Sequence, residues 1–315
     1  MCTLALENIT TTCAGRDYLL GDNVLTILLR DLGIEREPHA LDTIWQTIHT
    51  LCQWGESPPP VDLILPAVPF LQKVIISGES TTLRNACNIV RFFLTVEGLP
   101  EQTKMELVKH VVNILDTHSH KSVLSSALLV IHHLASGSQL ETEIVIRCGG
   151  IGIAKRLLEK SPHIYIKQQV CQIFANIMCG TAEQIEQLEK EGVTKSLISY
   201  LQDDSPLIRT EAAWAIANLM HNGTLPQIRR AVEMGGIHAM CKLLKDPSEM
   251  ILEVTIEGFI NFLKQGEALK EDQNPHILAI EAISEDFYES LSNVPRLTDN
   301  AKIIALLNTL MQRTF

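Results

Sequence analysis

The feature that most constrains the fold of this chain is an internal repeat of about 42 residues. Residues 211–224 read EAAWAIANLMHNGT and residues 168–181 read QQVCQIFANIMCGT, so Asn218 and Asn176 occupy one slot 42 residues apart. The slot recurs in steps of 41 to 43 residues at Asn8, His49, Phe92, His133, Asn176, Asn218 and Asn261. A fixed period of this length is the signature of a repeat architecture.

Two further markers keep the same step. Gly149, Gly192 and Gly235 lie 43 residues apart, and each is followed by apolar residues at helical spacing. Glycine suits a helix end that needs a left-handed residue before the chain turns. Proline after a polar residue starts a helix readily, and such pairs stand at Ser161-Pro162, Ser205-Pro206 and Asp246-Pro247.

The period predicts a repeat with one short helix, a turn and two longer helices. Repeats of about 40–47 residues with two or three helices mark armadillo or HEAT arrays, in which each unit buries its apolar face against its neighbours. We expect an all-α, armadillo-repeat, right-handed superhelical solenoid. Residues 1–315 form a single array of about seven units, the first of them partial, and residues 266–315 form an irregular C-terminal capping repeat.

Composition narrows the choice of partners. The net charge of -11, from 37 acidic and 26 basic residues, argues against nucleic acid and favours a basic ligand, although acidity also serves solubility alone. The eight cysteines show no C-x-x-C spacing, and we expect buried thiols in a reducing compartment. The sequence has no apolar run near the ~20 residues of a membrane span, so we expect no membrane insertion.

The motifs of common enzymes are missing from the sequence. It holds no P-loop, no G-x-S-x-G and no G-x-G-x-x-G. The adjacent His132 and His133 point to different helix faces, and neither His118 nor His120 has a ligand partner nearby in sequence. We therefore expect no catalytic residue, no metal and no cofactor.

The repeat that holds Trp214 offers a candidate binding face. Glu211, Trp214 and Asn218 are three and four residues apart, so they share one side of a helix. An amide can grip a peptide backbone, an indole can hold the stem of Lys or Arg, and a carboxylate can pair with its charged tip. The alternative is that Trp214 packs in the core and Asn218 bridges helices. We favour the surface row because asparagine recurs in the slot, at Asn8, Asn176, Asn218 and Asn261.

These residues resemble the importin α family, the adaptors of nuclear import. Residues 211–268, beginning EAAWAIANLMHNGTLPQIRRAV, are similar to its late armadillo repeats, and residues 44–71, IWQTIHTLCQWGESPPPVDLILPAVPFL, are similar to a repeat followed by a proline-rich loop. The resemblance runs from the middle of the third repeat to the tenth. It implies that a row of Trp and Asn side chains binds nuclear localisation signals at a major and a minor site.

The resemblance also implies which residues bind. Trp214, Asn218 and Glu211 match a complete minor-site rung, whereas Asn176 belongs to a rung with Gln172 in the Trp slot and Gln169 in the acidic slot. Thr142 matches a minor-site threonine, and Trp45 matches a major-site tryptophan with His49 in the Asn slot. Asn8 matches the asparagine of the rung upstream, and Leu4 fills the tryptophan slot of that rung. The departures from the pattern are Asn88, Phe92, Leu129 and His133.

The implied partners are basic, signal-bearing cargo proteins and, through the C-terminal repeat, the export receptor with Ran, in the cytoplasm and the nucleus. The sequence has no counterpart of the first two repeats or of the basic segment that binds importin β, so importin β is not an expected partner. Two hypotheses stay open: an adaptor for basic signals, or a degenerate, non-transport armadillo scaffold for another protein. Binding of a Lys/Arg peptide through Trp214 and Asn218 would distinguish them.

Overall fold

A computed structural model describes residues 12–32, 38–52, 58–269, 274–283 and 287–314. All regular secondary structure in these ranges is helical, as the sequence predicted. None of the helices in this part of the chain combines the length and the apolar character needed to cross a membrane. By their contacts the residues group into two units: residues 1–134 with 147–150, and residues 135–146 with 151–315. The prediction of one continuous array of about seven repeats stays a prediction.

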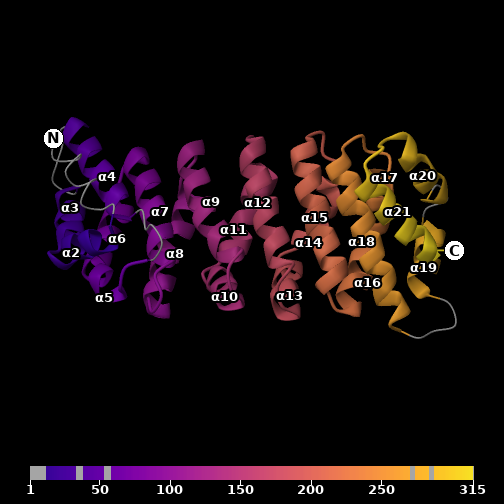
Figure 1. Cartoon of the computed structure of the whole chain (residues 1–315), viewed down its shortest axis with the longest axis horizontal. Helices are drawn as coiled ribbons and strands as arrows, with labels where there is room; N and C mark the ends of the chain where they lie inside the picture. Colours follow the sequence, from indigo (N-terminus) through magenta and orange to yellow (C-terminus); the bar gives the residue numbers. More distant parts are fainter. Residues whose placement is uncertain (1–11, 33–37, 53–57, 270–273, 284–286, 315) are drawn as a thin grey trace. The chain divides into compact units, whose positions relative to one another are not determined.

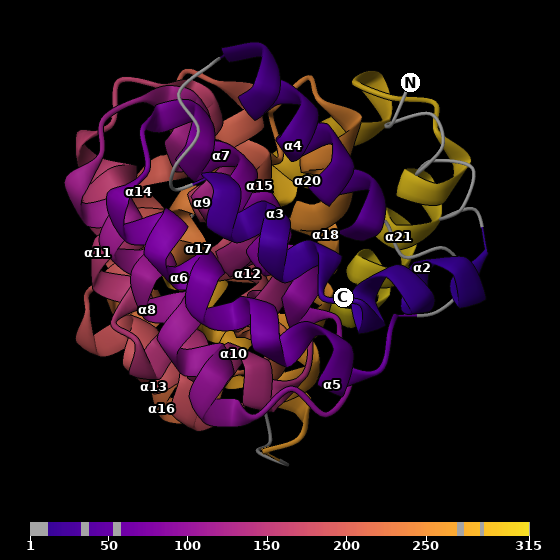
Figure 2. The ribbon, with the colours of Figure 1, turned by 90° about the vertical axis from the view of Figure 1, so that its left-hand side faces the viewer.

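The N-terminal unit is built from short and medium helices around an aliphatic core. In chain order they are α2 (Cys13–Gly21), α3 (Val24–Leu32), α4 (Pro38–Cys52), α5 (Val61–Ile64), η1 (Leu65–Ala67), α6 (Val68–Ser77), α7 (Ser80–Leu94), α8 (Glu101–Thr117) and α9 (Lys121–Ala135). Helix α3 packs against both α4 and α6, and α4 packs against α7. Figure 2 turns this unit toward the viewer, with α3 between α4 and α6.

The C-terminal unit repeats three helices in the same order. Its elements are α10 (Gln139–Arg147), α11 (Gly150–Lys160), α12 (Ile164–Ile177), α13 (Ala182–Lys190), α14 (Val193–Tyr200), α15 (Pro206–Asn222), α16 (Leu225–Glu233), α17 (Gly236–Leu243), α18 (Glu249–Glu267), α19 (Pro275–Ile283), α20 (Phe287–Asn293), η2 (Val294–Arg296) and α21 (Ala301–Thr314). The second helix of a repeat was expected to be long, but α14 and α17 have only 8 residues each. That prediction was wrong because the chain turns after Tyr200 and after Leu243.

The glycine and proline markers lie at the turns between helices. Gly149, Gly192 and Gly235 have φ angles of 76°, 70° and 86°, so the prediction of left-handed residues is confirmed. Pro206 is the first residue of α15 behind the N-cap Ser205, as predicted. The other two prolines, Pro162 and Pro247, precede the N-caps of α12 and α18 by one residue instead of opening the helix.

The third helices of the repeats, α12, α15 and α18, form one layer in the C-terminal unit. Helix α15 packs against α12 on one side and α18 on the other, and α21 packs against α18 (Figure 1). Helix α18 lies close to its neighbours at Gly258, where an added Cβ would lie 3.1 Å from the Cβ of Ala217 and 2.6 Å from Cε of Met240. Small residues at this contact let the two helices pack closely, and this fixes the spacing of the layer.

Two buried glutamines join successive repeats. Thr181 with Gln184, and Thr224 with Gln227, form capping boxes at the N-termini of α13 and α16. The Nε2 atom of each glutamine also donates to a backbone carbonyl of the preceding repeat, from Gln184 to Gln139 at 2.9 Å and from Gln227 to Ala182 at 2.8 Å. Because each amide satisfies its own helix start and the neighbouring backbone, it sets the register between repeats.

The cysteines do not all follow the prediction of buried thiols. Cys52, Cys87, Cys171 and Cys241 are buried, Cys148 is half-buried, and Cys13 and Cys179 are exposed. The two exposed residues stand at helix ends, where Cys13 opens α2 and Cys179 follows α12. A helix end has fewer packing neighbours than a helix interior, so the apolar surroundings of these thiols in sequence did not mean burial.

Candidate functional site

Helix α15 carries three predicted site residues on one narrow stripe. Between residues 210 and 220, the partly exposed positions are Glu211, Trp214 and Asn218, and every other residue is buried. Their spacing of three and four residues places them on the same face, one turn apart. The stripe therefore presents a carboxylate, an indole and an amide in order along the helix.

The neighbouring third helices expose matching stripes. Within residues 170–177 of α12 the partly exposed positions are Gln172 and Asn176, and within residues 251–263 of α18 they are Glu253, Glu257 and Asn261. The polar row is defined as these eight residues: Gln172, Asn176, Glu211, Trp214, Asn218, Glu253, Glu257 and Asn261. Asparagine thus occupies the same slot in three helices that pack side by side.

Hydrogen bonds fix the register between α12 and α15. Glu211 Oε1 accepts from Gln172 Nε2 at 2.7 Å and from Gln168 Nε2 at 3.3 Å. A glutamine therefore stands where the matching repeat has Trp214, and its amide already contacts the carboxylate of the next helix. The same register recurs between α15 and α18, where Gln265 Nε2 donates to the backbone carbonyl of His221 at 3.0 Å.

Asn218 lies on the exposed stripe of α15 and also connects two repeats. Its Nδ2 donates to the backbone carbonyl of Ala175 in α12 at 2.9 Å. Asn222, one turn later, donates to the carbonyl of Met178 at 3.4 Å and to that of Asn218 at 3.1 Å. The structure thus contains the helix-bridging bond that was the alternative to a surface role, on a side chain that is still partly exposed.

Thr142 and Asn176 come together in a small pocket of the C-terminal unit. The pocket has a volume of about 190 Å³ and also contains Gln139, Cys179 and Gln184 in its lining. Thr142 is only 4% exposed, so a ligand would contact its side chain only within this pocket. Thr142 and Asn176, which the sequence assigned to neighbouring rungs, therefore line the same pocket.

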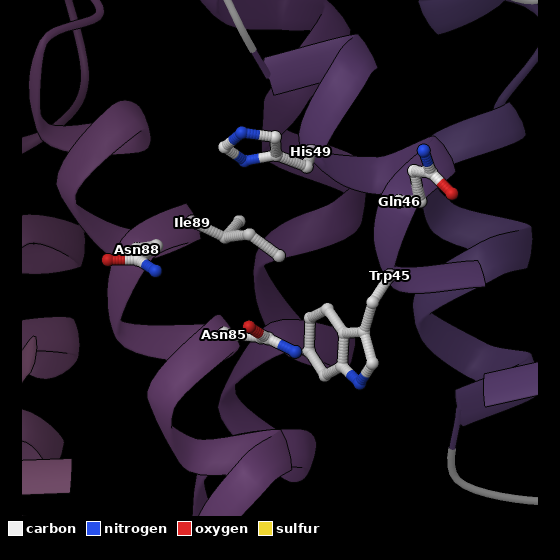
Figure 3. Close-up of a pocket in the computed structure, with 6 residues that line it drawn as sticks. All are labelled: Trp45, Gln46, His49, Asn85, Asn88 and Ile89. Carbon is white, nitrogen blue, oxygen red and sulfur yellow. The ribbon is translucent and has the colours of Figure 1, made fainter. Parts of the chain in front are cut away.

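A second pocket lies between α4 and α7 of the N-terminal unit. It has a volume of about 270 Å³ and is lined by Trp45, Gln46, His49, Asn85, Asn88 and Ile89. In Figure 3 the indole of Trp45 extends from α4 toward Asn85 of α7. The predicted pair of Trp45 and His49 thus shares its pocket with two asparagines.

The residues that line this pocket differ in their exposure to solvent. Trp45 is 7% exposed, so its indole is mainly a packed wall, whereas His49 is exposed. The His49 ring packs edge-to-face on Phe92 with centroids 5.9 Å apart. Asn8, the remaining predicted site residue, lies outside the described residues.

Sequence reasoning missed several of the contacting residues. Asn85 lies one turn before Asn88, a spacing that could have predicted a shared face. The glutamines at 184 and 227 were visible as a T-x-x-Q pattern with the 43-residue step. Gln168 carried no such signal, because its bond to Glu211 depends on how two helices align.

Carboxylates influence two titratable groups near the polar row, Cys171 and Tyr200. Burial raises the pKa of the Cys171 thiol beneath the row, and the carboxylates of Glu211 and Asp203 raise it further. Burial also raises the pKa of the Tyr200 hydroxyl, with added effects from Cys171 and Asp203. The ammonium group of Lys167 acts on the Cys171 thiol in the opposite direction. Among the residues described, no group of three or more His, Cys, Asp or Glu could hold a metal ion.

Comparison with known proteins finds relatives along most of the chain. It is 32% identical over 272 residues to importin subunit alpha-8 of Arabidopsis thaliana, covering 84% of this chain and 60% of that protein. Importin subunit alpha-2 of the same plant is 32% identical over 292 residues, covering 91% of this chain and 54% of the relative. The chain therefore spans little more than half the length of these two relatives.

Two further comparisons concern the fold and the C-terminal part. A designed armadillo repeat protein in complex with the peptide (KR)4 matches with a TM-score of 0.67 at 22% identity, over 79% of this chain and 99% of that one. A family model described as non-SMC mitotic condensation complex subunit 1 matches residues 185–314. At this identity the designed protein bears on the fold alone.

The repeating three-helix units and these matches define the chain as an all-α armadillo-repeat protein, which confirms the predicted fold class. Within that class its sequence is similar to proteins named importin subunit alpha, in line with the resemblance that the sequence predicted.

Proposed function

We propose that the C-terminal unit binds extended, basic peptide segments of the nuclear localisation type, as the cargo-binding part of a nuclear import adaptor. The observation that supports it best is the polar row, in which Asn176, Asn218 and Asn261 occupy one slot on three adjacent helices. Similarity to proteins named importin subunit alpha supports the same assignment.

Each residue type in the row has a role toward such a ligand. The indole of Trp214 is a flat wall for the aliphatic stem of Lys or Arg, with a cation–π contribution. Glu211 and Glu257 are carboxylates that can pair with the charged tips. A third carboxylate, Glu253, already pairs with Lys302 of α21.

The existing hydrogen bond of the Asn218 amide determines which of its atoms could bind a peptide backbone. Its Nδ2 already donates to Ala175, whereas its Oδ1 accepts no hydrogen bond from the residues that the structure describes. The oxygen is therefore the atom proposed to accept from a peptide N–H. Because the amide is held by the neighbouring helix, it loses little rotational freedom when the peptide binds.

A degenerate scaffold for another protein partner is the second candidate function. It is favoured by the bond from Gln172 to Glu211, which occupies a carboxylate of the row at 2.7 Å, and by glutamine in a tryptophan slot. Under this alternative the row would not discriminate basic from neutral peptides, and Trp214 would act in packing alone.

Titration of a labelled octapeptide of alternating Lys and Arg distinguishes the two candidates. We expect Trp214→Ala to weaken binding by about 2 kcal/mol, roughly thirtyfold, because a central indole carries a large share of the binding energy. Asn218→Ala should weaken it as well. Leu140→Ala on α10, exposed and away from the polar row in sequence, is the matched control and should leave the affinity unchanged.

A second peptide, with Gln in place of every basic residue, tests the role of charge. Thermal unfolding of each variant establishes that the fold is intact. Equal affinity of wild type and Trp214→Ala for the basic peptide, or equal affinity of the wild type for the basic and the neutral peptide, would contradict the adaptor assignment and favour the scaffold.

The adaptor assignment extends to location and to a further partner. It predicts that the protein is found in the cytoplasm and the nucleus. It also predicts that the C-terminal repeat, α19 to α21, binds the export receptor with Ran. A fluorescent fusion should accumulate in the nucleus when a basic cargo is co-expressed. Its distribution should become independent of the cargo in the Trp214→Ala variant.

A further inference from the structure

Exposed apolar side chains recur at the start of the third helices in the C-terminal unit. Tyr165, Leu207 and Met250 are each the second residue of their helix, in α12, α15 and α18, and lie 42 and 43 residues apart. Their exposed fractions are 59%, 42% and 61%. These three residues are named the apolar margin.

The register of the helices places the members of the margin beside one another. Hydrogen bonds join residues 43 apart between α12 and α15, from Gln168 to Glu211 and from Asn218 to Ala175. A residue of one third helix therefore faces the residue about 43 positions further on in the next. Packed helices lie roughly 8–10 Å apart, so the margin forms a row with about that step.

Scattered exposed apolar residues are ordinary on a protein surface, but a recurring set in one register is not. The margin also continues the stripes of the polar row. Leu207 precedes Glu211 by four residues and Trp214 by seven, which is about 6 Å and 10 Å along the helix. Met250 stands three residues before Glu253 in the same way. Carboxylates therefore follow the apolar residues on two of the helices.

We infer that the C-terminal unit takes an extended segment in which apolar side chains alternate with basic ones. Successive side chains of an extended peptide point to opposite sides, so one set faces the apolar margin and the other faces Glu211 and Trp214. This inference rests on the proposed peptide-binding function and adds to it a requirement for apolar residues in the ligand. Negative charge beside the margin, on Glu211 and Glu257, makes the occupant cationic as well as apolar.

The experiment compares three nine-residue peptides on the full chain. One alternates Lys and Leu, one alternates Lys and Ser, and one alternates Glu and Leu. We expect the Lys/Leu peptide to bind about tenfold more tightly than the Lys/Ser peptide, because its leucines bury apolar surface on the margin. The Glu/Leu peptide should not bind, and it controls for nonspecific apolar adhesion.

Variants then locate the effect. The double variant Leu207→Ser/Met250→Ser should abolish the tenfold preference for Lys/Leu and leave Lys/Ser affinity unchanged. Both positions are exposed, so the fold should be retained, and thermal unfolding checks this. Leu140→Ser, at a side chain that is 79% exposed on α10, is the matched control and should keep the preference.

The outcomes separate the margin from the peptide-binding function. If Lys/Ser and Lys/Leu bind equally and Trp214→Ala weakens both, the margin is wrong while the proposed function stands. A preference that survives in the double variant also overturns the margin. If neither basic peptide binds, the proposed function fails and the inference fails with it. Self-association that the double variant abolishes, without a change in peptide affinity, would assign the margin to a second copy of the chain.

Discussion

Asn218 combines two tasks at a single position. It donates to the Ala175 carbonyl in α12, the third helix of the preceding repeat, and remains partly exposed on the stripe with Trp214. A polar side chain inside an apolar helix is costly when it is unpaired, and the bond to Ala175 removes that cost. A residue can therefore recur in a repeat for packing and still present an atom to a ligand.

Gly235 is a position where the backbone, and not space, requires glycine. Its φ angle is 86°, and a Cβ added there would meet no atom within 4 Å. We expect Gly235→Ala to lower the free energy of unfolding by about 1–2 kcal/mol, since a left-handed conformation costs that much for a residue with a Cβ. Urea denaturation followed by circular dichroism measures the change.

The matched control for this glycine is Gly21 at the end of α2. A Cβ added at Gly21 also meets no atom within 4 Å, but Gly21 does not have a positive φ. Gly21→Ala should therefore be neutral or slightly stabilising, because alanine restricts the unfolded chain. A loss of stability as large as that of Gly235→Ala would show that backbone conformation is not the cause.

Between elements, the capping glutamines link helices of successive repeats. Gln227 is 3% exposed, accepts from the Thr224 N–H at 2.9 Å and donates to Ala182 at 2.8 Å. Its removal leaves the N–H of Thr224 and the carbonyl of Ala182 without this partner. We expect Gln227→Ala to destabilise the chain by about 1–3 kcal/mol, because two hydrogen bonds worth about 0.5–1.5 kcal/mol each are lost, as measured by thermal unfolding.

Gln187→Ala, in the preceding repeat, supplies the comparison. Gln187 is a partly exposed residue of α13 at the edge of an open surface pocket. Its replacement should change stability by no more than about 0.5 kcal/mol, as expected for a surface position. Similar effects of the two substitutions would remove the argument that the capping amide links the repeats.

The last helix is attached to its neighbour through polar contacts that depend on pH. Thr298 and Asn300 donate to the carboxylate of Glu249 in α18, and these bonds hold its pKa below the ordinary value of 4.5. Arg313 of α21 pairs with Glu267 at the other end of the same helix. The contact between α18 and the residues that precede α21 is therefore strongest when the Glu249 carboxylate is charged.

Substitution of Glu249 should show this pH dependence. Since its folded-state pKa lies below the unfolded value, its contribution is complete above about pH 4.5 and is lost as the pH falls through the folded pKa. We expect Glu249→Gln to lower the thermal midpoint at pH 7, and the difference from wild type to vanish at strongly acidic pH. Glu233→Gln, at an exposed residue of α16, is the control and should show no such convergence.

For the whole molecule, the repeat could be predicted from sequence because it is local and periodic. The slot of Asn176 and Asn218 and the turn at Gly192 each follow from short patterns. The bond from Asn218 to Ala175 and the pocket shared by His49 and Asn85 could not be predicted, because they depend on how neighbouring helices align. The T-x-x-Q capping boxes could be predicted from the sequence. The second hydrogen bond of each glutamine, to the preceding repeat, could not.

The net charge of -11 acts on a ligand before any contact forms. Long-range attraction of this kind raises the association rate and is screened when the Debye length shortens, from about 10 Å at 0.1 M salt to about 3 Å at 1 M. Contacts with an indole such as Trp214 act after docking and mainly set how slowly the complex dissociates. The two contributions should therefore appear in different rate constants.

Stopped-flow binding of the Lys/Arg octapeptide tests this separation. Raising sodium chloride from 0.05 to 0.5 M should slow association by about tenfold and change the dissociation rate little. Trp214→Ala at low salt should do the reverse and speed dissociation, with association close to that of wild type. An association rate that is indifferent to salt would mean that the acidic surface does not steer the peptide. The charge of the chain would then serve solubility, and the choice of ligand would rest on the polar row and the apolar margin.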